Sequence, residues 1–200
     1  EIYVRDAHEN AEKMWNAVLE AGEEFGLMVI APAHHRRIAA GILSWGQDLD
    51  HETSPFQVNL AYQVPRNKAA DYIGKEALEK QRAIIDEGNA PFKMKMVGIT
   101  FGGKEITDYA PDFWLIEDTD GNEMGYVTSP WWSPELGTNI GLAWVPWSSS
   151  EVGTKLQVKL PEEYSDGGPA QGEVVEVPFR ESVNPNKREV QKAKGLDYAD

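Results

Sequence analysis

The chain has 200 residues, no cysteine and a formal net charge of −14, and 41% of its residues are hydrophobic. This length fits one large domain or two small ones, and the lack of cysteine excludes disulfides, thiol catalysis and thiolate metal sites. The negative charge argues against nucleic acid or an anionic membrane as a partner, and no apolar run approaches the ~20 residues of a membrane helix. We expect a cytoplasmic protein, since a chain without cysteine is compatible with a reducing compartment.

The first part of the chain is predicted to be a strand followed by helices. Residues 1–5 alternate and contain β-branched side chains, which predicts a strand. Between Asp6 and Gly22, apolar residues recur at three- and four-residue intervals, which predicts a helix that Asp6 caps and Gly22 ends. A second helix is predicted within residues 33–43, and it carries the basic cluster His34-His35-Arg36-Arg37.

Further along, we expect a strand near residues 56–64 and a helix between Gly74 and Gly88. After Gly88 the sequence changes to short β-rich runs, and Asp120-Gly121-Asn122 is a strong hairpin turn between two of them. The runs are KMVGITF, DFWLIED, EMGYVTS, NIGLAWV, TKLQVKL and GEVVEVPF. Six short strands in succession predict a compact antiparallel barrel or jelly-roll.

The predicted fold class is therefore α+β, in two parts. Residues 1–90 form an α+β segment, residues 91–180 a β-barrel domain, and residues 181–200 a polar tail on the surface. The chain opens on Glu1 rather than Met and inside a predicted strand, which suits part of a longer protein.

One polar loop gathers Asp48, Asp50, His51 and Glu52. Carboxylates are the ligands that hard cations prefer, which raises the question of a metal site. The calcium-loop spacing is absent, however, so we favour a solvated loop and predict no metal.

A tryptophan pair, Trp131-Trp132, lies between Ser129-Pro130 and Ser133-Pro134, and this pattern predicts a turn with exposed rings. An exposed aromatic pair suits stacking on a sugar or a heteroaromatic ring. Packing of the pair against the neighbouring domain is the alternative that we favour.

Several segments, in order, resemble the aminomethyltransferase family, which includes the T-protein of the glycine cleavage system and dimethylsulfoniopropionate demethylase. The resemblance runs from residue 1 to about residue 180 and corresponds to the C-terminal half of such proteins. The matching segments are Glu1-Ile2, Arg37 to Gly41, Trp45 to Asp50, Ser54-Pro55, Tyr72 to Leu78, Val97 to Ile99, GYVTSPWWSPEL and Pro178-Phe179.

The resemblance implies a tetrahydrofolate site in a channel that the polar loop and the following segment help to form. Glu1 falls where the family places a carboxylate that binds the pterin, and Tyr62 where it places a folate-contacting aromatic ring. A hydrogen bond to a charged group contributes roughly 1.5–3 kcal/mol, and ring stacking about 0.5–1.5 kcal/mol. We expect Glu1 and Tyr62 to lie on opposite sides of one cavity. The anionic glutamate tail of folate needs a cation, and the candidates are Arg36, Arg37, Arg66 and Lys68.

The implied activity is transfer of a methyl or aminomethyl group from a small S- or N-methylated donor to tetrahydrofolate. QVPRNK and SPWWSPEL resemble the dimethylsulfoniopropionate demethylase branch. The family's Ala-Arg-Asp reads Ala33-His34-His35 here, which puts a lipoyl-bound donor in doubt. The T-protein aminomethyltransferase is the alternative, and it would add a lipoylated H-protein as partner. A non-catalytic β module that binds carbohydrate or a protein is a further alternative.

The catalytic residue is expected elsewhere. In the family an Asp that assists proton transfer lies in the N-terminal half, before the strand that matches residues 1–5. We therefore predict no catalytic residue in this chain and expect it to be inactive by itself. Its expected partner is the N-terminal half of the same protein.

Overall fold

The computed structural model describes residues 1–66 and 68–179, so the tail predicted at 181–200 lies outside the described residues. The chain divides into two compact units, Glu1–Ala33 and His34–Asp200. Among the described residues, none of the helices combines the length and the apolar composition needed to span a bilayer. The predicted division near residue 90 stays a prediction.

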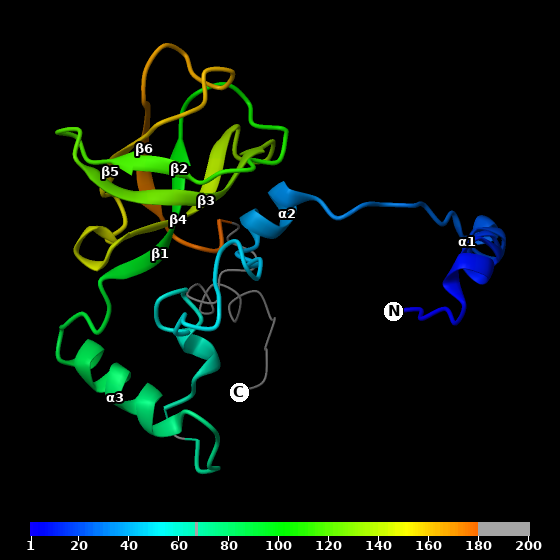
Figure 1. The fold of residues 1–200 in the computed structure, drawn as a ribbon, viewed down its shortest axis with the longest axis horizontal. Helices are drawn as coiled ribbons and strands as arrows, with labels where there is room; N and C mark the ends of the chain where they lie inside the picture. Colours follow the sequence, from blue (N-terminus) through cyan, green and yellow to red (C-terminus); the bar gives the residue numbers. More distant parts are fainter. Residues whose placement is uncertain (67, 180–200) are drawn as a thin grey trace, which may run out of the picture. The chain divides into compact units, whose positions relative to one another are not determined.

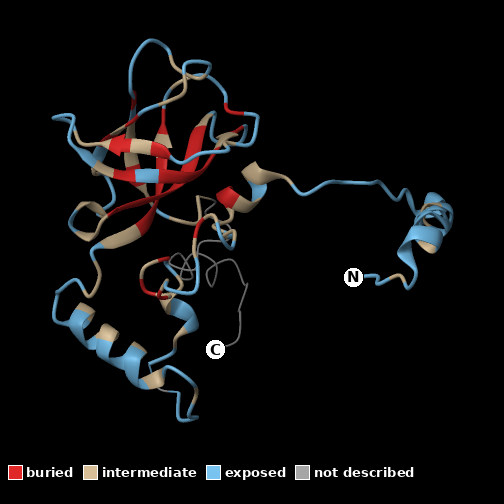
Figure 2. Cartoon of the chain, in the orientation of Figure 1, coloured by how far each residue is buried: buried red, intermediate tan, exposed pale blue. Residues whose placement is uncertain are grey.

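The first unit contains the predicted first helix, α1 (Ala7–Gly22), followed by a short 3-10 helix, η1 (Glu23–Phe25). Asp6 precedes α1 but forms no side-chain cap, because its backbone lies in the left-handed region at φ 51°. Its carbonyl oxygen instead accepts hydrogen bonds from the first turn of the helix. The apolar face of α1 stays exposed, as Figure 2 shows.

The strand predicted at residues 1–5 is wrong, since the structure has no strand there. A strand exists only where its N–H and C=O groups pair with a neighbour. Within the described residues, no strand pairs with this segment.

The second unit is built around a closed six-stranded barrel, which confirms the predicted β-barrel and all six β-rich runs (Figure 1). Around the barrel the strand order is β1-β4-β3-β2-β5-β6, and every neighbouring pair is antiparallel. The strands are β1 (Met94–Phe101), β2 (Trp114–Glu117), β3 (Glu123–Ser133), β4 (Thr138–Pro146), β5 (Lys155–Val158) and β6 (Ala170–Val175).

Two hydrophobic clusters share the barrel wall. Along β4, Ala143 and Val145 belong to the cluster that fills the barrel, because successive side chains in a strand point to opposite faces. Ile140, Leu142 and Trp144 alternate with them and belong to a second cluster. Because β4 is buried on both faces, its sequence is continuously apolar from Ile140 to Pro146.

The second cluster forms where α2 (His34–Ala39) and the segment 54–60 cover the barrel. Ile38 of α2 is fully buried there, and Val58 packs into the same cluster. This helix is the predicted second one, shortened to six residues. The third predicted helix is also confirmed, as α3 (Lys75–Asp86), and Gly88 follows its end with a left-handed φ of 81°.

The strand predicted at residues 56–64 is wrong. The segment forms consecutive turns and a 3-10 helix, η2 (Ala61–Gln63), with Asn59 at a φ of +62°. Its alternation arises because Val58 packs on the barrel while Gln57 and Asn59 donate side-chain hydrogen bonds to backbone oxygens of β1.

The exposed turn predicted at Trp131-Trp132 is also wrong, because both residues belong to β3 and are half-buried. Pro130 suggested a turn because proline cannot donate a ladder hydrogen bond. Here β3 shifts register between Val127 and Ser129, and Pro130 follows this irregularity without ending the strand.

Candidate functional site

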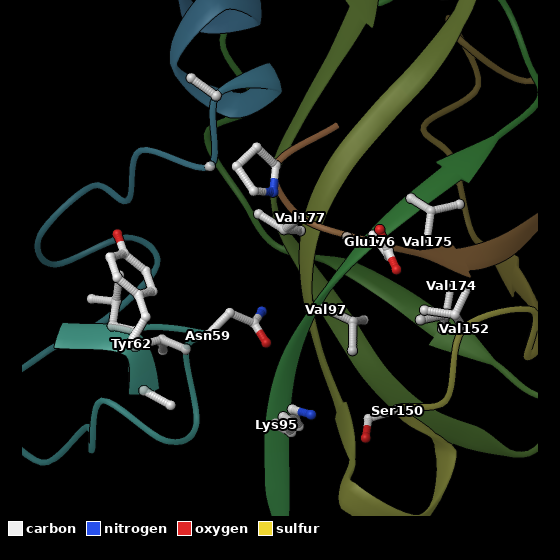
Figure 3. A pocket seen from close by; sticks show the side chains of 17 residues that line it. Asn59, Tyr62, Lys95, Val97, Ser150, Val152, Val174, Val175, Glu176 and Val177 are labelled. Atoms are coloured by element: carbon white, nitrogen blue, oxygen red, sulfur yellow. The ribbon is translucent and has the colours of Figure 1, made fainter. Parts of the chain in front are cut away.

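A cavity of about 560 Å³ opens beside Tyr62 in the second unit, within the size range of small-molecule sites. Figure 3 shows Tyr62 and Asn59 facing Lys95 and Val97 of β1 across this cavity. Further wall comes from the end of β6 and from the connection after β4, including Val152. The cavity therefore combines an aromatic ring, a cation, the carboxylate of Glu176 and an apolar wall.

Tyr62 is held beside the barrel by the segment that precedes it. Asn59 Nδ2 donates to the Met96 carbonyl oxygen at 2.9 Å, and the Met96 N–H donates to the Gln57 carbonyl oxygen at 2.8 Å. These bonds tie the segment to β1, and η2 then presents the Tyr62 ring, which is 57% exposed. A ring so placed can stack on a flat heterocycle.

Lys95 is a cavity residue that sequence reasoning missed. It lies on the same face of β1 as Val97, Ile99 and Phe101, which point into the barrel. Burial lowers the pKa of the Lys95 ammonium. Its Nζ lies 5.1 Å from the centroid of the Trp147 ring, and within the described residues it forms no ion pair. The signal was a lysine at the first of four alternating positions that are otherwise apolar.

We expect Lys95→Met to raise the urea midpoint of unfolding. Because burial lowers the folded-state pKa of Lys95, folding is penalised at every pH below the unfolded-state pKa of lysine, where the unfolded chain carries the charge. The gain should vanish at a pH above the unfolded-state pKa of lysine, where both states are neutral. Lys13→Met, at an exposed helix position, is the control. An unchanged midpoint for Lys95→Met at pH 7 would contradict the expected penalty for burying the Lys95 charge.

Arg37 lies in a buried polar network that joins α2, the polar loop and the barrel. Its Nη1 donates to Asp48 Oδ2 at 3.0 Å, and its Nη2 donates to Ser129 Oγ at 2.9 Å. The side chain of Asp48 is fully buried and that of Arg37 is 18% exposed. Asp48 Oδ1 also accepts from Thr128 Oγ1 and Ser129 Oγ, and Asp48 Oδ2 accepts from the Ser44 N–H. The Arg37 guanidinium thus connects α2 to the polar loop and to β3.

The other sequence-predicted cations lie apart from this network. Arg36 is exposed on α2. Arg66 donates two hydrogen bonds to Asp86, at 2.6 and 2.8 Å, and this exposed pair raises the pKa of Arg66 and lowers that of Asp86. Lys68 lies over the Tyr72 ring, 4.8 Å from its centroid. None of the three lines the Tyr62 cavity.

Glu1 belongs to the first unit, where its carboxylate is exposed and accepts a hydrogen bond from the Tyr3 hydroxyl. This bond raises the pKa of the Tyr3 phenol. Tyr62 belongs to the second unit. The convergence of Glu1 and Tyr62 on one cavity stays a prediction.

The polar loop divides into a buried and a solvated part. Asp48 is buried, so the solvated-loop interpretation is wrong for this residue, while Asp50, His51 and Glu52 are exposed as that interpretation requires. Hydrogen bonds from the Glu52 N–H and the Thr53 hydroxyl lower the pKa of Asp50. Among the described residues no group of three acidic or histidine side chains is placed to hold a metal ion.

His34 lies at the start of α2 and stacks on Trp131, with ring centroids 5.0 Å apart and an interplanar angle of 17°. Burial, and then the positive charge of Arg37, lower the pKa of this imidazole. Arg37 Nε donates to His34 Nδ1 at 3.4 Å, which fixes that nitrogen as an acceptor. Trp131 is therefore occupied by an intramolecular partner.

The barrel and the segments that cover it match known families of proteins. Residues 94–180 match the glycine cleavage T-protein C-terminal barrel domain, and residues 1–68 match the N-terminal domain of the same proteins. Aminomethyltransferase T of the glycine cleavage system from Bartonella henselae has a similar fold, with a TM-score of 0.58 and 24% identity over 74% of this chain and 38% of that one.

Curated relatives include an aminomethyltransferase of a Geobacillus strain, 37% identical over 72% of this chain and 36% of the relative. An aminomethyltransferase of Shouchella clausii is 31% identical over 90% of this chain and 45% of the relative. The dimethylsulfoniopropionate demethylase of Ruegeria pomeroyi is 33% identical over 81% of this chain and 41% of the relative. The chain thus spans less than half the length of these relatives.

The closed antiparallel barrel is covered by α2 and preceded in the chain by the polar loop. These features define a T-protein-type C-terminal barrel. The chain belongs to the aminomethyltransferase family.

Proposed function

We propose that this chain forms one wall of a tetrahydrofolate site in a one-carbon transferase. Membership of the family supports a transferase. The observation on which the proposal rests is the cavity that both Tyr62 and Lys95 line. The Tyr62 ring can stack on the flat pterin or benzoyl part of folate. The Lys95 ammonium, which has no carboxylate partner among the described residues, can pair with the glutamate tail.

Of the residues predicted from the sequence, we propose that Glu1 binds the pterin and that Arg36, which lies on α2 outside the Tyr62 cavity, is a second cation for a tail that extends beyond it. Arg66 is a weaker candidate for binding the tail, because it would first have to break its pair with Asp86. We assign Arg37 to positioning: its donors hold Asp48 and Ser129, and α2 then places Ala40 and Gly41 in the cavity wall. We also propose that the boundary between the α+β segment and the β-barrel domain lies at residue 90.

The one-carbon donor is proposed to be a small S- or N-methylated molecule, with the aminomethyl group of glycine cleavage as an alternative that the relatives support at least as well. In the second case a lipoylated H-protein is the partner. We propose that proton transfer is assisted by a residue outside this chain, because the chain spans less than half the length of its relatives. A cytoplasmic location completes the proposal. Trp131 stacks on His34, so the exposed pair required by the carbohydrate alternative is not formed.

The test is calorimetric titration of the whole protein with tetrahydrofolate and with the primary amide of tetrahydropteroate, which lacks the glutamate tail and carries no carboxylate. We expect Tyr62→Ala to weaken both ligands by roughly two- to tenfold, since stacking contributes about 0.5–1.5 kcal/mol. Lys95→Met should weaken tetrahydrofolate by a similar factor and leave the tetrahydropteroyl amide unchanged, because only the glutamate tail carries carboxylates.

Two matched variants serve as controls, Phe113→Ala for an exposed ring outside the cavity and Lys13→Met for an exposed cation. Tetrahydrofolate affinity should also fall as the pH rises through the lowered pKa of Lys95, and this dependence should disappear in Lys95→Met. Equal losses in all four variants, or no loss in any, would refute this site.

A further inference from the structure

A second cavity, of about 630 Å³, lies between the β1–β2 and β5–β6 connections of the barrel. It shares no lining residue with the Tyr62 cavity. Three aromatic rings and three carboxylates line it, together with two prolines and an alanine. The rings are those of Tyr109, Trp114 and Tyr164, and the carboxylates are those of Asp108, Asp112 and Glu163.

The two connections leave the same end of the barrel, because Phe101 at the end of β1 pairs with Gly172 near the start of β6 (Figure 1). The Lys104 N–H donates to the Tyr164 carbonyl oxygen at 2.9 Å. Gly103 allows this approach: a Cβ there would lie 2.8 Å from the same oxygen, and its φ is +96°.

The β1–β2 connection is also tied to the barrel. Asn139 of β4 is fully buried, and its Nδ2 donates to the Lys104 carbonyl oxygen at 3.0 Å while its Oδ1 accepts from the Ile106 N–H at 3.2 Å. Both sides of the cavity are therefore held in place before any ligand binds, and such preorganisation reduces the entropy cost of binding.

The aromatic walls meet at an angle. The ring centroids of Trp114 and Tyr164 lie 5.8 Å apart with an interplanar angle of 37°. Trp114 is 6% exposed, while Tyr109 is 57% exposed and its ring centroid lies 5.6 Å from that of His34. Ring faces attract cations electrostatically, and several rings around one volume form the kind of cage that holds methylated ammonium groups.

The charged side chains that line the cavity are all acidic, and one cation lies nearby, the Lys104 ammonium, which donates to the Glu163 carbonyl oxygen at 3.2 Å. No lysine or arginine lines it, and within the described residues the carboxylates of Asp108, Asp112 and Glu163 form no hydrogen bond or ion pair. Burial first, and then the charges of Glu163 and Asp108, raise the pKa of the Tyr164 phenol, so both carboxylates act on the space beside that ring. An anion is disfavoured in such a cavity.

We propose that this cavity binds a small alkylated ammonium cation, with its methyl groups against Trp114 and Tyr164 and its charge balanced by Asp108 and Glu163. The rings and prolines offer apolar surface that a hydrated metal ion would not use, and among the described residues no metal-holding group is found. The inference does not depend on the proposed folate site.

The test is an NMR titration of the 200-residue chain with choline and with 3,3-dimethylbutanol, its uncharged isostere, at constant ionic strength. We expect choline to shift the Trp114 indole N–H and the Tyr164 amide along a saturable curve, and the alcohol to bind at least about tenfold more weakly, since cation–π and charge pairing are lost. Absence of a saturable shift, or equal binding of the two compounds, would overturn the proposal.

Variants separate the ring from the charges. Tyr164→Phe keeps the aromatic face and should retain choline binding, whereas Tyr164→Leu should lose about tenfold in affinity. Asp108→Asn should weaken choline several-fold and leave the alcohol unaffected, while Asp166→Asn, an acid outside the cavity, should change neither. Unperturbed resonances of β4 show that each variant is folded, and a choline affinity insensitive to both Tyr164→Leu and Asp108→Asn would refute the assignment.

Discussion

Asp48→Asn should lower the free energy of unfolding by about 3–5 kcal/mol, the cost of breaking a buried ion pair from one side. Both carboxylate oxygens accept from donors: Oδ1 from Thr128 and Ser129, Oδ2 from Arg37 and the Ser44 N–H. In one orientation the asparagine amide nitrogen would face Arg37 Nη1 and the Ser44 N–H, which can only donate. In the other it would face the Thr128 and Ser129 hydroxyls, which would have to turn their protons elsewhere. The loss would also leave Arg37 largely buried without its counter-charge.

Urea unfolding followed by tryptophan fluorescence measures this loss, and Asp86→Asn is the matched control. Asp86 also pairs with an arginine, Arg66, but both side chains are exposed. Exposed pairs contribute about 0–1 kcal/mol. If the two variants lose equal stability, burial of the Arg37–Asp48 pair has no energetic consequence.

Gly125→Ala should destabilise the barrel by about 3 kcal/mol, at the upper end of the range for overpacking. An added Cβ would lie 2.0 Å from the Trp144 carbonyl oxygen and 3.1 Å from its carbon, which are backbone atoms of the neighbouring strand. They cannot move aside without disturbing the β3–β4 ladder, where Tyr126 pairs with Trp144. The Trp144 indole also donates to the Asp48 carbonyl oxygen, so a shift would reach the buried network.

Gly168→Ala is the control for the effect of the extra methyl group itself. A Cβ at Gly168 meets no atom within 4 Å, and the φ of this residue lies outside the left-handed region. Its thermal midpoint should stay within a degree or two of the parent, or rise slightly through the reduced entropy of the unfolded chain. A neutral Gly125→Ala would mean that β3 and β4 lie further apart than described.

The barrel could be predicted from the sequence because each strand carries its own signal, an apolar run bounded by turn residues. The strand at 56–64 was mispredicted because Val58 and its neighbours alternate for a tertiary reason, packing on a barrel that local patterns do not contain. The strand at 1–5 failed for the opposite reason, since its pattern was suitable but no described strand pairs with it.

The site was predicted only as far as a family motif reaches. Tyr62 does line a cavity, but Lys95 went unnoticed because a lysine in a strand is ordinarily solvated, and only closure of the barrel buries its stem. Arg37 and Asp48 match the family motif, yet their contact with Ser129 spans more than 80 positions of the chain. Local sequence carries no information about such a pairing.

Strand β4, buried on both faces, has a consequence for how ligands could enter. Ile140 and Leu142 hold α2 down from one side, while Ala143 and Val145 fill the barrel from the other. Displacing α2 would uncover one face of β4, so we expect this helix to stay in place when a ligand enters the Tyr62 cavity. We therefore expect the backbone amides of α2 to exchange as slowly as those of β4.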